Sequence, residues 1–111
     1  MDYMFYGCVL LASLNLSNFN TQNVNYMNGM FYDCNSLIYL DLSNFNTQNV
    51  YYMDSIFAGC NSLRFIDISS FTQNFNIFVG TNFPDNCTIK IKEGTNTNNF
   101  DTPCQYEIKE N

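Results

Sequence analysis

The sequence predicts an α/β solenoid in which each 26-residue repeat contributes one short parallel strand and one short helix. Three observations lead to this prediction. Cys8, Cys34 and Cys60 are evenly spaced, each 26 residues from the next, and the segment Leu16–Val24 recurs without change at 42–50. Each block also joins an alternating apolar stretch to one with helical spacing. Since one block cannot bury both stretches alone, we expect the copies to stack and share a core.

The strand is predicted where leucines alternate. In the second block Leu37, Leu40 and Leu42 form an L-x-x-L-x-L pattern that is followed by Phe45. The alternating part buries one face of a short strand. The other two blocks carry the same pattern at Leu11, Leu14, Leu16 and Phe19, and at Leu63, Ile66, Ile68 and Phe71. This pattern, with a period in the range of 20–29 residues, is typical of leucine-rich repeats.

The helix is predicted in the remaining half of each block. Val50, Met53, Phe57 and Cys60 are separated by three, four and three residues, which places them on one face of a helix. The preceding copy has Val24, Met27, Phe31 and Cys34 at the same spacing. Thr and Asn residues just before each set are suited to capping the first turn. We therefore expect one helix per repeat, packed against the sheet.

The chain is predicted to form one leucine-rich-repeat domain over residues 1–111. The repeats cover about residues 4–29, 30–55 and 56–80, and a C-terminal cap covers about 81–111. Alternating residues in 87–93 and 104–110 predict two capping strands that close the sheet. Because the chain enters in the middle of a repeat, we expect it to be part of a longer array, with a short gene product or end-to-end stacking on another chain as alternatives.

The composition restricts the chemistry. The net charge is −6 and the four basic side chains are not clustered, which disfavours nucleic-acid binding. Histidine is absent, which excludes Ser-His-Asp and Cys-His catalysis and His-ligated zinc. No apolar run reaches the ~18 residues of a membrane span, and no signal peptide is recognisable. We expect no enzymatic activity, cofactor or metal.

The cysteines fall into two groups. Cys8, Cys34 and Cys60 are expected to be packed free thiols, because neighbouring helices lie ~8–10 Å apart and a disulfide needs Cα atoms within ~7 Å. A column of thiols also does not converge on one metal ion. Cys87 and Cys104 would lie ~5 Å apart if their strands pair in parallel. A disulfide between them, which would indicate an oxidising compartment, and two free thiols both remain open.

A longer motif points to a family. Residues 37–63 read almost in full as L-x-x-L-D-L-S-N-F-N-T-x-N-V-x-x-M-x-x-M-F-x-x-C-x-S-L, which resembles the repeat of the BspA-like leucine-rich-repeat surface proteins. The resemblance covers residues 4 to about 79, and the first copy departs from it at Val9, Leu10 and Asn15. It implies a cell-surface or extracellular location and adhesion to host or matrix proteins. It implies no shared catalytic residues and no cofactor.

Side chains that alternate with the buried strand residues are expected to line the concave face of the sheet, where partners of solenoids usually dock. Tyr39 and Phe65 are typical contact residues, since aromatic rings bring large area at small entropic cost. The candidate binding residues are Ser13, Asn15, Tyr39, Asp41, Phe65, Asp67 and Lys90. The alternative is a hydrated polar surface without a partner. Two stacked carboxylates without a further acidic ligand make a poor calcium site.

The sequence therefore predicts a non-catalytic protein-interaction module of a surface or secreted protein. Its partner would be a host or matrix protein bound on the concave face, with no nucleic acid and no membrane span in this chain. The alternative is a structural spacer, or a self-assembling segment that stacks end to end at its uncapped N-terminus and has no ligand of its own.

Overall fold

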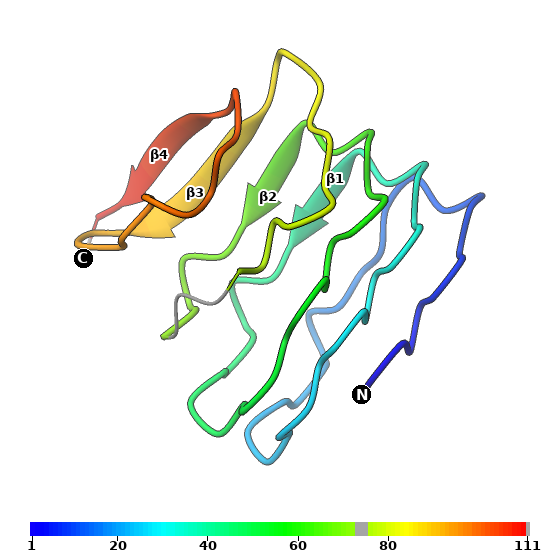
Figure 1. Cartoon of the computed structure of the whole chain (residues 1–111). Helices are drawn as coiled ribbons and strands as arrows, with labels where there is room; N and C mark the ends of the chain where they lie inside the picture. Colours follow the sequence, from blue (N-terminus) through cyan, green and yellow to red (C-terminus); the bar gives the residue numbers. More distant parts are fainter. Residues whose placement is uncertain (73–75, 111) are drawn as a thin grey trace.

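Four short parallel strands form a sheet on one side of the molecule (Figure 1). The computed structural model describes residues 1–72 and 76–110. The strands are β1 (Tyr39–Asp41), β2 (Phe65–Asp67), β3 (Thr88–Lys92) and β4 (Gln105–Lys109), and they lie side by side in that order. The chain returns from each strand to the next by a long loop, so that successive turns of the chain, here called coils, stack beside one another.

The register places equivalent positions of the repeats next to each other. Leu40 of β1 pairs with Ile66 of β2, 26 residues further along, and Ile66 pairs with Ile89 of β3. The first coil contributes an isolated bridge between Ser13 and Tyr39, and no strand among the described residues. All three of the paired apolar residues are fully buried, so the alternation in the sequence identifies the inner face of the sheet.

β1 and β2 are short because a side chain turns the chain away at the end of each one. The Asp41 carboxylate accepts a hydrogen bond from the backbone N–H of Ser43 at 2.9 Å. Asp67 accepts one from Ser69 at 2.9 Å, and Asn15 accepts one from Ser17 at 3.1 Å. These side chains act as Asx turns, which compete with continued pairing of the strand.

The predicted helices are absent from residues 1–72 and 76–110, so the predicted fold class, a helix-bearing leucine-rich-repeat solenoid, was wrong. The segments in question run as turns that are hydrogen-bonded from coil to coil. The amide of Phe31 donates to the carbonyl of Ile56 at 3.0 Å, and the amide of Asp33 donates to Ala58 at 2.8 Å. The intervening Tyr32 amide donates back to Gly29 at 2.9 Å.

Backbone conformation explains why a helix does not form. An α-helix needs negative φ at every residue, and each amide bonds to the carbonyl four residues earlier. In the second coil Gly29 and Asp33 have φ of 58° and 59°, which interrupts any helix between them. The same two positions are left-handed in each of the first three coils: Tyr3, Gly29 and Ser55, and Gly7, Asp33 and Gly59. The spacing of apolar residues in this segment therefore correctly predicts which residues are buried, but it does not reflect a helix.

The core lies between the sheet and these turn segments. Phe31 and Phe57 stack with their ring centroids 5.9 Å apart, and Phe57 stacks on Phe78 at 5.5 Å. This aromatic column faces the apolar residues of the sheet and leaves Phe31 and Phe57 without exposed area. The resulting body is compact, with extents of 29 × 27 × 23 Å.

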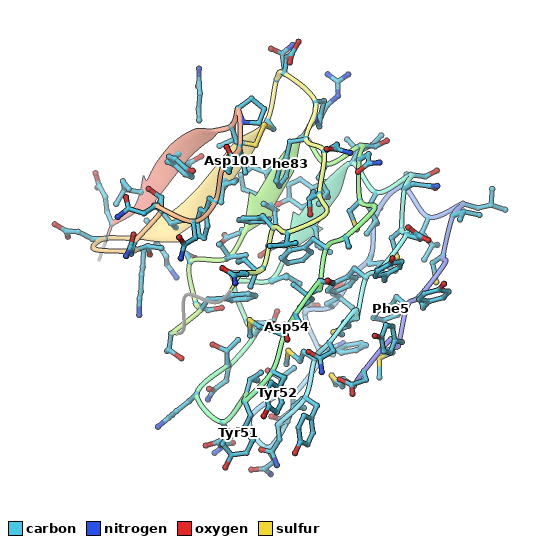
Figure 2. All side chains as sticks on the ribbon, in the orientation of Figure 1. Phe5, Tyr51, Tyr52, Asp54, Phe83 and Asp101 are labelled. Carbon is cyan, nitrogen blue, oxygen red and sulfur yellow. A yellow bond between two sulfur atoms is a disulfide. The ribbon has the colours of Figure 1, made fainter. Side chains whose placement is uncertain are left out.

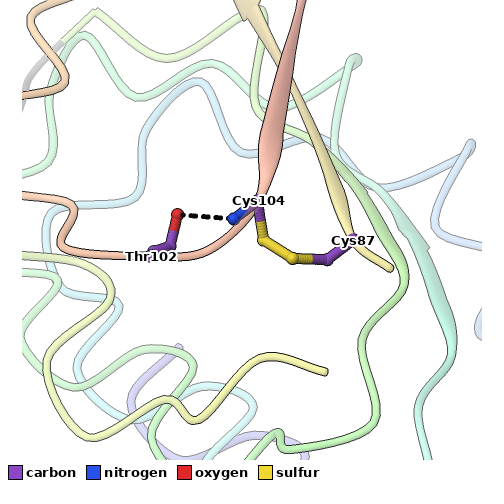
Figure 3. Close-up of a disulfide and its surroundings, with 3 residues drawn as sticks. All are labelled: Cys87, Thr102 and Cys104. Atoms are coloured by element: carbon purple, nitrogen blue, oxygen red, sulfur yellow. Dashed lines mark hydrogen bonds between the residues drawn. A yellow bond between two sulfur atoms is a disulfide. The ribbon is translucent and has the colours of Figure 1, made fainter. Parts of the chain in front are cut away.

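The C-terminal segment covers the last coil. Phe100 packs edge-on against Phe78, with centroids 4.8 Å apart. Cys87 and Cys104, whose pairing the sequence left open, form a disulfide that joins the starts of β3 and β4, with Cα atoms 4.6 Å apart (Figure 3). The amide of Cys104 also donates to the Thr102 hydroxyl at 3.3 Å. Covalent and aromatic contacts thus hold the closing strands in place.

Membrane insertion through a helix finds no support in this part of the chain. Over residues 1–72 and 76–110 the structure has no helix with the length and apolarity needed to cross a bilayer.

Candidate functional site

The outer face of the sheet carries the predicted binding residues in two rows. One row contains Tyr39 beside Phe65, and the other contains Asp41 beside Asp67, which in turn lies beside Lys90. Ser13 and Asn15 extend the rows into the first coil, where Ser13 bridges Tyr39. The 26-residue register of the strands therefore brings together side chains that are distant in sequence.

Tyr39 and Phe65 form an exposed aromatic pair. Their ring centroids are 4.9 Å apart with an interplanar angle of 13°, so the rings stack across the two strands. Tyr39 is 48% exposed, and Phe65 is partly exposed. Stacking fixes the orientation of each ring, so little side-chain entropy remains to be lost when a partner covers them.

A hollow of about 350 Å³ lies at the β1 edge of this face. Four of the predicted residues line it, and they are Ser13, Asn15, Tyr39 and Asp41. Leu14, Leu16, Ser17, Ser43 and Asn44 complete the lining. The hollow thus combines one aromatic wall with hydroxyl, amide and carboxylate groups, a mixture that suits recognition of a polypeptide.

The two aspartates differ although they occupy equivalent positions. Hydrogen bonds from the side chain and the backbone N–H of Ser43 hold the pKa of Asp41 below its ordinary value, with a smaller contribution from Lys90. Asp67 is only 7% exposed, and it accepts hydrogen bonds from both the amide and the hydroxyl of Ser69. Asp67 therefore serves the turn after β2, and it offers little surface to a partner.

Lys90 marks a change in the character of the face. Its Nζ lies 3.6 Å from Oε1 of Glu107 on β4, and both side chains retain exposed area. The face thus carries the aromatic pair and two aspartates over β1 and β2, and a lysine–glutamate ion pair over β3 and β4. Within residues 1–72 and 76–110, no group of three or more His, Cys, Asp or Glu side chains is arranged to hold a metal ion.

Cys8, Cys34 and Cys60 form a column on the turn side of the core. The thiol of Cys34 donates to the Phe5 carbonyl at 2.9 Å, and the Cys60 thiol donates to Phe31 at 2.9 Å. All three are free, and Cys34 and Cys60 are buried. The expected helix-to-helix spacing does not apply here, because neighbouring coils are joined directly by backbone hydrogen bonds.

The role of the strand-end polar residues was not predicted from the sequence. Asn15, Asp41 and Asp67 each precede a serine by two positions, and that short motif is visible in every repeat. Asn and Asp two residues before a polar residue are common turn formers. Interpreted in this way, the motif would have assigned Asp67 to a turn rather than to a binding surface.

The comparisons with known proteins give a family match. A family model described as "Mycoplasma protein of unknown function, DUF285" matches residues 1–90. No curated protein and no solved structure matches the chain. The assignment to BspA-like leucine-rich-repeat proteins was therefore wrong: the repeat motif that suggested it lies within a region described by a different family.

Proposed function

The chain belongs to the DUF285 family, for which no function is assigned, and we propose that it is a non-catalytic module that binds a protein partner on the outer face of its sheet. The stacked pair of Tyr39 and Phe65 beside the adjoining hollow carries this proposal. Aromatic side chains are enriched where proteins contact one another, and they supply much of the binding free energy.

The polar part of the same surface supports recognition by shape and hydrogen bonding. Ser13, Asn15 and Asp41 surround the aromatic wall, and hydrogen bonds from Ser43 lower the pKa of Asp41 and hold its carboxylate in place. A partner segment that covers the rings would replace its hydrogen bonds to water with hydrogen bonds to these side chains. The charged side of the face, with Lys90 and Glu107, would then form a rim with weaker interactions.

The proposed module acts outside the cell or at its surface. The disulfide between Cys87 and Cys104 supports this location, because such bonds form and persist in oxidising compartments. Catalysis is not part of the proposal, since the chain has no histidine to serve as a base. Adhesion to host or matrix proteins was an expectation from the BspA-like resemblance alone, and it is not part of the proposal either.

Selection from a displayed random-peptide library tests the proposal and does not require the natural partner to be identified first. Peptides selected on the wild-type chain should bind Tyr39→Ser at least tenfold more weakly, because about 1.4 kcal/mol is lost with one anchoring ring. The matched control is Ile38→Ser, which replaces a neighbouring exposed residue outside the hollow. Peptides that bind Tyr39→Ser as tightly as wild type would contradict the proposal.

The second candidate is a self-assembling or spacer segment, and the first coil favours it. Phe5, Cys8 and Leu14 are partly exposed, whereas their equivalents in the next two coils are fully buried. In later coils, the backbone carbonyls at the positions equivalent to Asp2 and Met4 accept hydrogen bonds from amides of the preceding coil. Within the described residues, the carbonyls of Asp2 and Met4 accept no such bond. Sedimentation equilibrium distinguishes the two: association that grows with concentration supports assembly, and a monomer throughout supports the binding module.

A further inference from the structure

The turn side of the molecule carries an exposed cluster of tyrosines away from the sheet. Tyr26, Tyr51 and Tyr52 are 48%, 63% and 54% exposed. Tyr26 and Tyr52 stack with centroids 5.7 Å apart, and Tyr51 lies 6.3 Å from Tyr26. Figure 2 shows Tyr51 and Tyr52 together at one end of the turn segment, with Asp54 next to them along the chain.

A second group of tyrosines lies on the turn segments of the first two coils. Tyr6 stacks on Tyr32 at 5.3 Å, and Tyr3 packs edge-on against Tyr6 at 5.9 Å. Gly29 makes room for this group, because a Cβ there would overlap the ring of Tyr3. We call these six residues the tyrosine patch: Tyr3, Tyr6, Tyr26, Tyr32, Tyr51 and Tyr52.

A row of polar residues lies close to both groups along the chain: Asp2 precedes Tyr3, Asn28 follows Tyr26 by two residues, and Asp54 follows Tyr52 by two. The amide of Asn28 donates to Asp2 Oδ1 at 2.8 Å, and the amide of Asp54 donates to Asn28 Oδ1 at 2.9 Å. The side chains at this position thus bond along the stack of coils. Asp2 and Asp54 are both exposed, so an exposed carboxylate lies at each end of this row.

The charged side chains of the coils that form the patch all have one sign. Residues 1–63 contain the aspartates at positions 2, 33, 41 and 54 and no Lys, Arg or His, and all four basic side chains of the chain lie at or after Arg64. Two exposed carboxylates that no basic side chain of these coils neutralises attract cations. The rings add to this attraction, since the face of an aromatic ring carries a negative potential.

We propose that the tyrosine patch binds an arginine-rich segment of another protein. A guanidinium stacks on tyrosine rings and pairs with a carboxylate through two hydrogen bonds, so one side chain engages both features of the surface. Lysine has a compact charge and stacks less well. This surface shares no residue with the outer face of the sheet, so the inference stands apart from the proposed function.

Titration with a hexa-arginine peptide tests the proposal directly. The chain has no tryptophan, so its intrinsic fluorescence comes from tyrosine, and six of its eight tyrosines belong to the patch. We expect hexa-arginine to bind and to change this fluorescence at low salt, and to bind about fivefold more tightly than hexa-lysine. Equal binding of the two peptides, or no binding of hexa-arginine, would overturn the proposal.

Variants identify the surface that binds. The double variant Tyr51→Leu/Tyr52→Leu should weaken hexa-arginine binding about fivefold or more, whereas Tyr51→Phe/Tyr52→Phe should retain it because the rings remain. Tyr51→Leu alone provides a milder test, since Tyr51 is the most exposed of the three. Unchanged binding in a folded leucine variant would overturn the proposal.

A pair of charge variants gives the matched control. Asp54→Asn and Asp41→Asn each remove one negative charge, but Asp54 lies two residues after Tyr52 in the polar row, whereas Asp41 lines the hollow on the sheet. We expect Asp54→Asn to weaken binding of hexa-arginine more than Asp41→Asn, and Tyr39→Ser to leave it unchanged. Equal weakening by both charge variants would show that the peptide responds only to net charge, which contradicts the assigned site.

Discussion

At the scale of single residues, the same position serves two different purposes in successive coils. Asn15, Asp41 and Asp67 each accept the amide of the serine two residues later. Only Asp67 is buried, where it also accepts the Ser69 hydroxyl at 2.6 Å. Asp41 lines the hollow and remains accessible. A polar residue on the open face of a strand is therefore not in itself a contact residue.

The buried turn after β2 leads to a first prediction. Asp67→Ala should lower the free energy of unfolding by about 1–3 kcal/mol, because two buried donors of Ser69 lose their acceptor. Asp67→Asn should lower it much less, since Asn15 makes the same pair of bonds to Ser17. Urea denaturation checks both variants. Equal stability of the alanine variant and the wild type would contradict the assigned role.

Asp41 makes stability depend on pH. Its pKa is depressed in the folded state, chiefly by Ser43, so it contributes stability above its unfolded pKa of about 3.9. That contribution is lost as the pH falls through the folded pKa. Between pH 5 and the acid limit of folding, the wild type should therefore lose more stability than Asp41→Asn. Parallel acid dependence of the two proteins would show that Asp41 is not stabilised in this way.

At the scale of elements, the strands were predictable and the turn segments were not. Alternation at Leu40 and Leu42 depends only on which side chains face the core, and it led correctly to the inner face of β1. The spacing from Val50 to Cys60 likewise identified buried residues, but it was interpreted as a helix. The left-handed backbone at Gly29, Asp33 and equivalent residues prevents a helix, and it cannot be predicted from the spacing of apolar residues.

The candidate site was predictable to a similar extent. Tyr39 and Phe65 stand at equivalent repeat positions, so the sequence alone placed them side by side on the open face. The burial of Asp67 was not predictable from alternation, because it depends on a hydrogen bond to Ser69 after the strand has ended. The tyrosine patch required the actual path of the turn segments.

Two glycines at equivalent positions test the contact between coils. Gly7 and Gly59 both have positive φ, of 69° and 78°. Gly7→Ala should lower the free energy of unfolding by about 1 kcal/mol through backbone strain alone, because a Cβ there meets nothing within 4 Å. Gly59→Ala should lower the free energy of unfolding by about 2 kcal/mol more than Gly7→Ala does, since its Cβ overlaps the Asp33 side chain and lies 3.1 Å from the Asp33 Cα. Thermal or urea unfolding of the two variants gives both losses, and similar values would contradict close stacking of the coils.

At the scale of the whole molecule, the two ends are built differently. The C-terminal end is closed by β4, by Phe100 and by the disulfide. The first coil has a bridge at Ser13 and, among the described residues, no strand, and its Phe5, Cys8 and Leu14 are partly exposed. The outer face of the sheet and the tyrosine patch both span several coils, so both surfaces depend on the stacking.

The disulfide between Cys87 and Cys104 stabilises the C-terminal end covalently. The double variant Cys87→Ser/Cys104→Ser should unfold with a free energy about 3 kcal/mol lower, because the bond closes a loop between residues that are 17 apart. Guanidinium denaturation of the variant and the oxidised wild type gives the difference. An unchanged midpoint would mean that Phe100 and the pairing of β3 with β4 already hold the cap.

The stacking of coils through direct hydrogen bonds is the claim on which both surfaces depend, and a scalar coupling measured by NMR across a hydrogen bond tests it most directly. We predict a coupling between the amide nitrogen of Phe31 and the carbonyl carbon of Ile56, whose bond is 3.0 Å long. A coupling from Phe31 to the Met27 carbonyl instead would indicate a helix and would contradict the account.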